Sequence, residues 1–415
     1  MKIIAPILIG FLFFIFPFNA SSYGVLTHEA IIDAAWEKSI MPLLKARYPS
    51  STAEQFKEAH SYAYGGAVAP DMGYYPFGSA LFTNLVHYVR SGDMVEALLK
   101  DAENVNQYAF ALGFLSHYEA DNYGHPLATN KSVPLVYPKL QKKFGSTITY
   151  ADDKISHMRM EFGFDVVQVA KGNYASEAYH GFIGFKVDTT VLAKAFLETY
   201  GLDISEVFGN HLNLTVQTFR WIVANIFPFI TKTAWVQKKD DILKTNPTAT
   251  SRSFGYRMHR KQYRNEFGKA SKGPGFFASI VSLFIRVIPK VGPLRPLKFK
   301  APTPLAEKYF VQSFDTIFQH YSANLKQLNR PGISLKDLDF DTGKPTERCE
   351  YSLADETYQD LVIQLKKDDF KTLDAPLKQN ILSFYSGMNA PQKYKKSCGE
   401  FFTALSDLKN FSPKP

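Results

Sequence analysis

Cysteine is nearly absent from this chain of 415 residues, which has two, Cys349 and Cys398. No Cys-x-x-Cys pair occurs, so the sequence excludes a zinc site built on paired thiolates and a dithiol redox motif. No low-complexity run or internal repeat stands out. With 45% hydrophobic residues, the chain has enough apolar side chains for a large core, in two domains or in one with elaborations. Whether the two cysteines pair stays open.

A hydrophobic run long enough for a comfortable membrane span is also missing from the start of the chain. The apolar run at residues 3–18 follows Lys2 and precedes small residues. A short basic start, an apolar stretch of this length and small residues are typical of a cleaved signal peptide. We therefore expect residues 1–22 to be removed, Tyr23 to become the first residue, and the protein to be secreted or periplasmic. An uncleaved anchor is the alternative.

Acidic residues are scarce in one region. The whole chain has 48 Lys and Arg against 39 Asp and Glu, a net charge of +9. Residues 238–300 alone hold fifteen of these basic residues and three acidic ones, so the remainder is slightly acidic. The apolar run 276–288 in this region is too short to span a bilayer. It is either a core helix beside a solvated basic loop or, through residues 257–298, a peripheral contact with an anionic membrane surface. Nucleic acid is a partner only under an alternative interpretation of the function.

Apolar residues recur at helical spacing through most of the chain. Thr27 is expected to cap a helix that carries His28 in its first turn. A helix from residue 53 is expected to end at Gly65-Gly66, and the segment 126–149 is expected to be irregular. The other predicted helices cover residues 79–90, 94–102, 152–169, 191–200, 216–227, 305–328 and 361–384.

His117, Asp121 and His125 follow one another at steps of four, in a helical pattern that begins at Val105 and is expected to end near His125. Such steps place three side chains on one stripe of an α-helix. A buried carboxylate between two imidazoles is costly unless a cation neutralises it. A solvated polar stripe is the alternative for this segment alone. His157 and Glu161, also four apart, repeat the spacing of two ligands on one metal.

Further motifs precede and follow this stretch in a fixed order. They are Tyr23-Gly-x-x-Thr-His28, Gly66-x-x-x-Pro70-Asp71, Val86-His87-Tyr88, Ser116-His117-x-x-x-Asp121-x-x-x-His125 and His157-x-x-x-Glu161. Together they resemble the zinc-dependent phospholipase C superfamily, which also contains fungal single-strand nucleases and the catalytic domain of GPI-specific phospholipase D. The resemblance covers roughly residues 23–170 and is expected to continue to about residue 235. Many members begin the mature chain with Trp where this one has Tyr23.

The resemblance implies an all-α, multi-helix fold with three zinc ions in a cleft. The ligands it implies fall into three sets: Asp71, His87, His117 and Asp121; His125, His157 and Glu161; and His28, the amine and carbonyl of Tyr23 and a shared carboxylate of Asp121. Three residues separate Asp121 from His125, as in the GPI-specific phospholipase D type. The secreted bacterial phospholipases and the fungal nucleases commonly have five.

Nitrogen and oxygen ligands are typical of catalytic zinc, which keeps a position for water. We expect an exported zinc-dependent phosphodiester hydrolase, phospholipase C-like, in which zinc-bound hydroxide attacks the phosphorus of a phospholipid. Asp71 is the candidate general base. The alternatives are a single-strand nuclease, a GPI-type phospholipase D-like enzyme and a non-catalytic zinc-stabilised surface or binding protein.

The expected division of the chain follows from these patterns. Residues 1–22 are the signal peptide, 23–235 the catalytic domain and 236–300 a basic, partly apolar insert or linker. Residues 301–415 are expected to form a C-terminal helical region without recognisable chemistry.

Overall fold

The computed structural model describes residues 24–171, 173–174, 185–223, 240, 243–244, 298–328, 333–387 and 398–413. Within these ranges the structure is helical apart from loops and one isolated β-bridge between Leu338 and Pro345, so the all-α prediction is confirmed. None of the helices described here is long and apolar enough to cross a membrane. The predicted signal peptide, Tyr23, nearly all of the basic segment and the side chain of Cys398 lie outside the described residues.

The helices follow one another with short connections. In chain order they are α2 (Val25–Ala35), η1 (Trp36–Ile40), α3 (Met41–Arg47), α4 (Ala53–Val68), η2 (Ala69–Tyr74), α5 (Ala80–Tyr88), α6 (Ser91–Asp101), α7 (Val105–Gly124), η3 (His125–Thr129), α8 (Asn130–Val136), α9 (Pro138–Phe144), α10 (Lys154–Lys171), α12 (Thr189–Tyr200), α13 (Ile204–Val207), α17 (Pro304–Gln327), α18 (Ser352–Lys367), α19 (Ala375–Phe384) and α20 (Cys398–Asn410). Residues 212–223 are helical as well.

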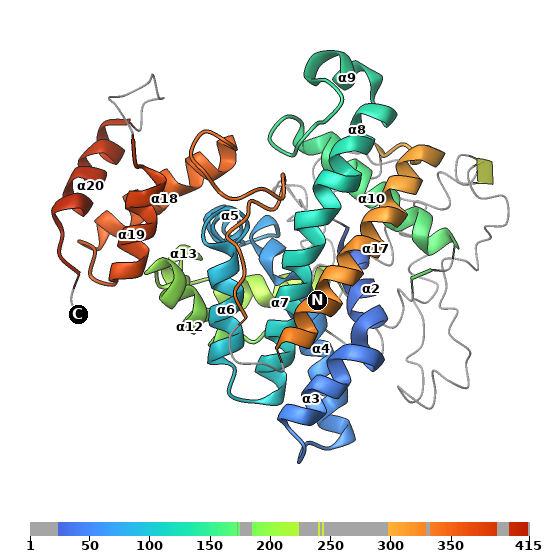
Figure 1. Cartoon of the computed structure of the whole chain (residues 1–415), viewed down its shortest axis with the longest axis horizontal. Helices are drawn as coiled ribbons and strands as arrows, with labels where there is room; N and C mark the ends of the chain where they lie inside the picture. The colour runs from blue at the N-terminus through green and yellow to red at the C-terminus, as the bar shows by residue number, and fades with distance from the viewer. Residues whose placement is uncertain are drawn as a thin grey trace, which may run out of the picture.

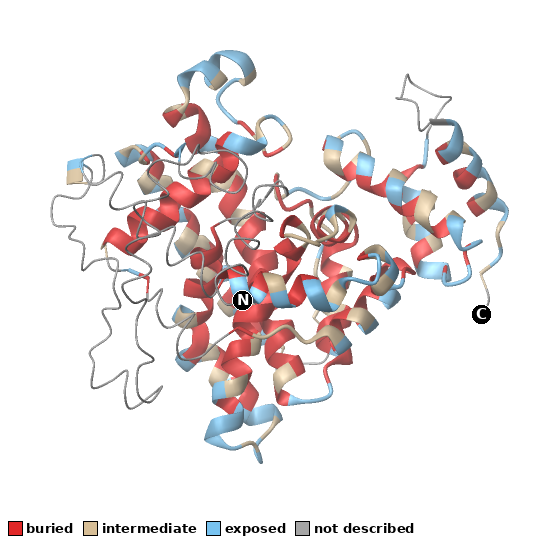
Figure 2. Ribbon diagram, turned by 180° about the vertical axis from the view of Figure 1, so that it is seen from behind, coloured by how far each residue is buried: buried red, intermediate tan, exposed pale blue. Residues whose placement is uncertain are grey.

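Helix α7 forms the centre of the molecule (Figure 1). It packs against α4, α6 and α17, and α12 covers the outer side of α6. Nearly every residue of α7 is buried, which is why it lacks the polar face of a surface helix. The group α18–α20 lies at one end of the molecule, where α18 contacts α5, and its outer faces are exposed (Figure 2).

The closest helix pair, α4 and α7, corrects one prediction. Gly65 and Gly66 do not end α4, which continues to Val68. They let neighbouring backbone approach, because a Cβ at Gly66 would lie 2.0 Å from the carbonyl oxygen of Phe110. Gly113 of α7 has the same role, since its Cβ would lie 2.1 Å from the oxygen of Ala63. These glycines reflect helix packing rather than a break.

The prediction that Thr27 caps a helix is wrong, because α2 begins two residues earlier, at Val25. Its first turn is capped by the side chain of Asp165 from α10. The Thr27 hydroxyl donates to Asp165 Oδ1 at 2.7 Å, and the Leu26 N–H donates to Oδ2 at 3.1 Å. A carboxylate that satisfies the free N–H groups of a helix start from another helix leaves no local sequence signal.

The segment 126–149 was expected to be irregular, and this too is wrong. The α-helix ends at Gly124, close to the predicted position, but the chain continues through η3, α8 and α9 to Phe144. Pro126 lies where α7 passes into η3, so its missing N–H falls at the change from one helical hydrogen-bond pattern to the other. Farther on, the helix predicted over 361–384 is two helices, α18 and α19.

Candidate metal centre

The candidate ligands that the structure describes come from six helical elements and meet around the C-terminal half of α7. All of them are buried, with at most 3% of the side chain exposed. His28 lies on α2, Asp71 on η2, His87 on α5, His117 and Asp121 on α7, His125 at the start of η3, and His157 and Glu161 on α10. Tyr23, the remaining predicted ligand, lies outside the described residues.

Four of these side chains meet at the spacing of ligands around one zinc ion. Two ligand atoms of a tetrahedral site lie about 3.3 Å apart when each is about 2.0 Å from the metal. The Nε2 atom of His87 lies 3.4 Å from Asp71 Oδ1 and 3.6 Å from Asp121 Oδ2. His117 Nε2 lies 3.1 Å from the same oxygen of Asp121 and 3.5 Å from His87 Nε2. The arrangement therefore suits a single small divalent cation.

His28 approaches the other oxygen of Asp121. Its Nε2 atom lies 3.4 Å from Asp121 Oδ1, and its ring stacks on that of His117 at 4.3 Å between centroids. The ligand atoms of His28, His117 and Asp121 all lie within 4.8 Å of one another, as do those of Asp71, His87 and His117. The two oxygens of Asp121 thus face two neighbouring candidate positions.

The third predicted set is looser. Glu161 Oε1 lies 2.9 Å from His157 Nδ1 and 3.3 Å from His125 Nε2. Among the described residues, however, no group whose ligand atoms all lie within 4.8 Å of one another includes these three side chains. Asp121 Oδ1 lies 3.9 Å from His125 Nε2, so this set adjoins the other two.

Backbone carbonyls orient two of the imidazoles. The Nδ1 of His117 is 2.9 Å from the oxygen of Ala67, and the Nδ1 of His87 is 2.8 Å from that of Thr83. A carbonyl only accepts, so each Nδ1 carries a proton, and Nε2 is the nitrogen of each ring that is left to bind a cation. The two Nε2 atoms face each other across 3.5 Å. A cation between them can be bound by both nitrogens, so the residues fit a metal.

The buried carboxylates support the same conclusion. In the described part of the chain, imidazole nitrogens approach the oxygens of Asp71 and Asp121, and no other hydrogen-bond donor reaches them. Burial alone raises the pKa of Asp121, but the imidazoles of His117 and His125 hold it well below its usual value. Burial lowers the pKa of His87, yet hydrogen bonding and charge from Asp121 and Asp71 raise it to about 9. Without a metal, protons on the imidazoles balance the negative charge that a cation would otherwise neutralise.

Two polar residues beside the ligands escaped prediction. Asp341 Oδ1 accepts a hydrogen bond from His125 Nδ1 at 3.0 Å, and Asn130 Oδ1 lies 2.9 Å from His157 Nε2. Asp341 belongs to the C-terminal region, in which the sequence shows no recognisable chemistry, and it nevertheless contacts a candidate ligand. The Asp341-Thr-Gly343 sequence is typical of a surface turn, so no pattern marks it.

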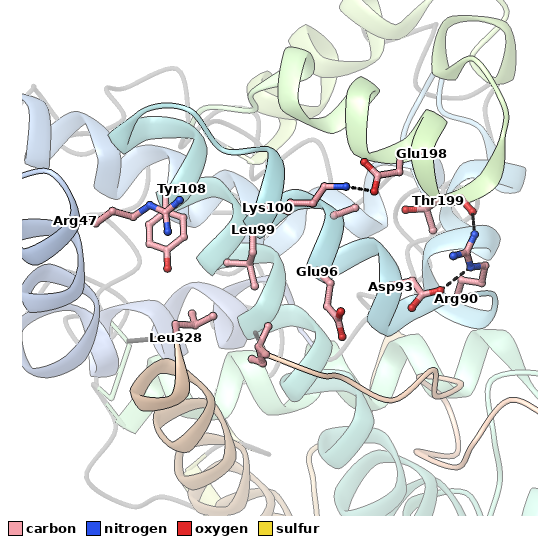
Figure 3. Close-up of a pocket in the computed structure, with 12 residues that line it drawn as sticks. Arg47, Arg90, Asp93, Glu96, Leu99, Lys100, Tyr108, Glu198, Thr199 and Leu328 are labelled. Carbon is pink, nitrogen blue, oxygen red and sulfur yellow. Dashed lines mark hydrogen bonds and ion pairs between the residues drawn. The ribbon is translucent and has the colours of Figure 1, made fainter. Parts of the chain in front are cut away.

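A cavity of about 540 Å³ lies between α6, α12 and the end of α17, away from these ligands (Figure 3). None of the candidate ligands lines it. Its basic side chains already have partners: Arg90 bonds Asp93 and the oxygen of Thr199, Lys100 pairs with Glu198, and Arg47 lies over the Tyr108 ring. The metal centre, rather than this cavity, therefore carries the candidate chemistry.

Comparison with known proteins agrees with the geometry. A family model described as zinc dependent phospholipase C matches residues 27–210. The matched region contains every described candidate ligand from His28 to Glu161 and excludes Asp341. No curated protein and no solved structure matches the chain.

Proposed function

Because this chain belongs to the zinc-dependent phospholipase C superfamily through residues 27–210, we propose that it is a zinc-dependent hydrolase of phospholipid phosphodiester bonds. One observation carries the proposal. The Nε2 atoms of His87 and His117 face each other at 3.5 Å, beside the carboxylate of Asp121, which in the described chain is approached by imidazole nitrogens and by no other donor. Such an arrangement of buried ligands is costly without a cation.

The chain's own residues have distinct roles in this proposal. Asp71, His87, His117 and Asp121 hold one ion, His28 and Asp121 contribute to a second, and His125, His157 and Glu161 to a third. Zinc held by nitrogen and oxygen ligands lowers the pKa of a coordinated water to about 7 and polarises phosphoryl oxygens. We assign to Asp71 the acceptance of the proton from the attacking water. Its carboxylate is buried, and in the described chain no donor bonds its Oδ2, which leaves that oxygen as an acceptor.

The proposal includes export. Residues 1–22 have the pattern of a cleaved signal peptide, and cleavage gives Tyr23 a free amine. That amine is the proposed further ligand beside His28. N-terminal sequencing of the mature protein tests this step, because a chain that keeps residue 1 has no amine at Tyr23.

The test uses the mature full-length protein, its zinc content, phospholipid vesicles and single-stranded oligonucleotides. We expect release of a phosphorylated headgroup that stops on chelation and returns with zinc. His117→Ala should abolish it. His320→Ala should not, because His320 on α17 bonds the hydroxyl of Tyr123 and none of the candidate metal ligands. Undiminished activity after chelation would contradict the proposal.

The remaining outcomes select among the alternatives. Phosphatidic acid as product would indicate D-type cleavage. Cleavage of oligonucleotides but not of lipid would indicate a single-strand nuclease. Bound zinc without any hydrolysis would indicate a zinc-stabilised binding protein.

A further inference from the structure

The buried carboxylate of Asp341 accepts three hydrogen bonds beside the metal centre. Its Oδ1 accepts from His125 Nδ1 at 3.0 Å. Its Oδ2 accepts from the hydroxyl of Tyr88 at 2.9 Å and from the hydroxyl of Tyr351. Asp341 is buried, and an ionised carboxylate only accepts, so the proton of this contact belongs to His125. The other ring nitrogen then presents its lone pair.

That nitrogen points at the metal centre. His125 Nε2 lies 3.3 Å from Glu161 Oε1 and 3.9 Å from Asp121 Oδ1. A carboxylate behind a ligating imidazole fixes its tautomer and orientation and increases its basicity. We propose that Asp341 is a positioning residue for the metal ligand His125, through which the C-terminal region completes the metal centre. This inference rests on the zinc-binding function proposed above.

The backbone of Asp341 acts on a second ligand. Its carbonyl oxygen accepts from Asn130 Nδ2 at 2.7 Å. This bond sets the orientation of the amide, so that Asn130 Oδ1 faces His157 Nε2 at 2.9 Å and accepts its proton. The Nδ1 of His157 is then the nitrogen that faces Glu161. One residue of the C-terminal region therefore orients both imidazoles of the third ligand set.

The loop that carries Asp341 is hydrogen-bonded to α5 and to the start of α6. Asp337 Oδ1 accepts from the N–H groups of Gly92 and Asp93 at 3.0 and 3.2 Å, at the start of α6. The Phe340 N–H donates to the carbonyl of His87 at 3.1 Å. These bonds indicate that the loop is a permanent part of the site and does not open during turnover.

Close packing fixes the same loop from the other side. The ring centroid of Phe340 lies 5.0 Å from that of His87 and 5.8 Å from that of His117. Gly343 has φ +69°, and a Cβ there would lie 2.3 Å from the oxygen of Asn122 in α7. The loop therefore fits directly against the helix that supplies His117 and Asp121.

Asp341 lies 216 residues from His125 in sequence and beyond the end of the matched family region at residue 210. His125 Nδ1 faces this loop, where Asp341 accepts its proton. The C-terminal region thus takes part in metal binding in addition to any separate role.

The experiment measures zinc affinity and cobalt substitution in the full-length mature protein. Asp341→Asn keeps the size of the side chain and removes its charge. We expect zinc affinity to fall about 10- to 100-fold at one position, and the visible spectrum of the Co²⁺ form to change. Asp339→Asn is the matched control. Asp339 is a buried neighbour in the same loop, but it bonds Thr342 rather than a ligand histidine.

The outcomes separate the two proposals. A wild-type protein that binds zinc, with Asp341→Asn equal to it in affinity, stoichiometry and cobalt spectrum, overturns the role of Asp341 and leaves the proposed function intact. An equal loss of affinity in Asp339→Asn also overturns that role, because any damage to the loop then suffices. A wild-type protein that binds no zinc overturns both. Should Asp341→Ala fail to fold, Asp341→Asn still decides.

Discussion

Asp165 on α10 and Thr27 on α2 are joined by two hydrogen bonds inside the core. The Thr27 hydroxyl donates to Asp165 Oδ1 at 2.7 Å and its N–H donates to the same oxygen at 3.2 Å. The next residue, His28, is a candidate ligand. The start of α2 is therefore held in place by the helix that also supplies His157 and Glu161, so the two helices position their ligands together.

This pair predicts a pH dependence of stability. Burial raises the pKa of Asp165 from its usual 3.8 to about 7, although the bonds from Thr27 and Leu26 lower it. A group with a raised pKa in the folded state contributes stability that is full below about pH 4 and is lost as the pH rises through 7. In Asp165→Asn this loss should disappear. Urea unfolding of both proteins at pH 5 and pH 8 measures it, and equal pH dependence would contradict the prediction.

A second prediction concerns the contact between α4 and α7. Gly113→Ala should destabilise the fold by about 1–3 kcal/mol or more, because the added methyl meets the backbone oxygen of Ala63 rather than a movable side chain. Gly399→Ala is the control, since a Cβ there meets nothing within 4 Å. Thermal and urea unfolding compare the two. Equal stability of the two variants would show that the helices can separate without cost.

These cases show which features of the structure the sequence predicts and which it does not. The i, i+4 spacing of His117, Asp121 and His125 predicts a shared face, because it depends only on helix geometry. The order of the motifs predicts which helices supply the ligands. Gly65 and Gly66 were misinterpreted, because glycine serves both to end helices and to let them pack closely, and only the neighbour decides between these roles.

Contacts between distant parts of the chain explain the other errors. Thr27 has the residue type of a local cap, but its partner is Asp165, 138 residues away. The link between His125 and Asp341 spans 216 residues. Neither pair shares a helix or a periodic pattern, so their proximity exists only in the folded chain. The candidate metal ligands were therefore predictable as residue types, and the residues that hydrogen-bond them were not.

A third prediction follows from the protonated state of the centre. The pKa of His87, which burial lowers and Asp121 and Asp71 raise, is about 9 without a cation. Zinc must displace this proton, so binding should release protons and the apparent affinity should increase as the pH rises from 6.5 towards 9. Competition with a chromophoric chelator at several pH values measures the affinity. An affinity independent of pH, after correction for the chelator, would contradict this.

The last prediction concerns Asn130, whose amide nitrogen donates to the carbonyl of Asp341 while its oxygen accepts from His157. Asn130→Asp keeps the acceptor for His157 but places an oxygen against the carbonyl of Asp341. Two buried acceptors without a proton between them should lower the free energy of unfolding by about 1–3 kcal/mol or more. Zinc stoichiometry should stay unchanged, because the contact with His157 remains.

Unfolding curves and metal analysis of the same samples separate these two effects. Asn210→Asp, at an exposed position, controls for the added charge itself and should change neither. A variant at position 130 that unfolds like the wild type would mean that the amide nitrogen contributes nothing to holding Asp341. Loss of both zinc and stability would mean instead that the orientation of His157 depends on the whole amide of Asn130. The side-chain oxygen at position 130 would then be insufficient to keep the imidazole in place.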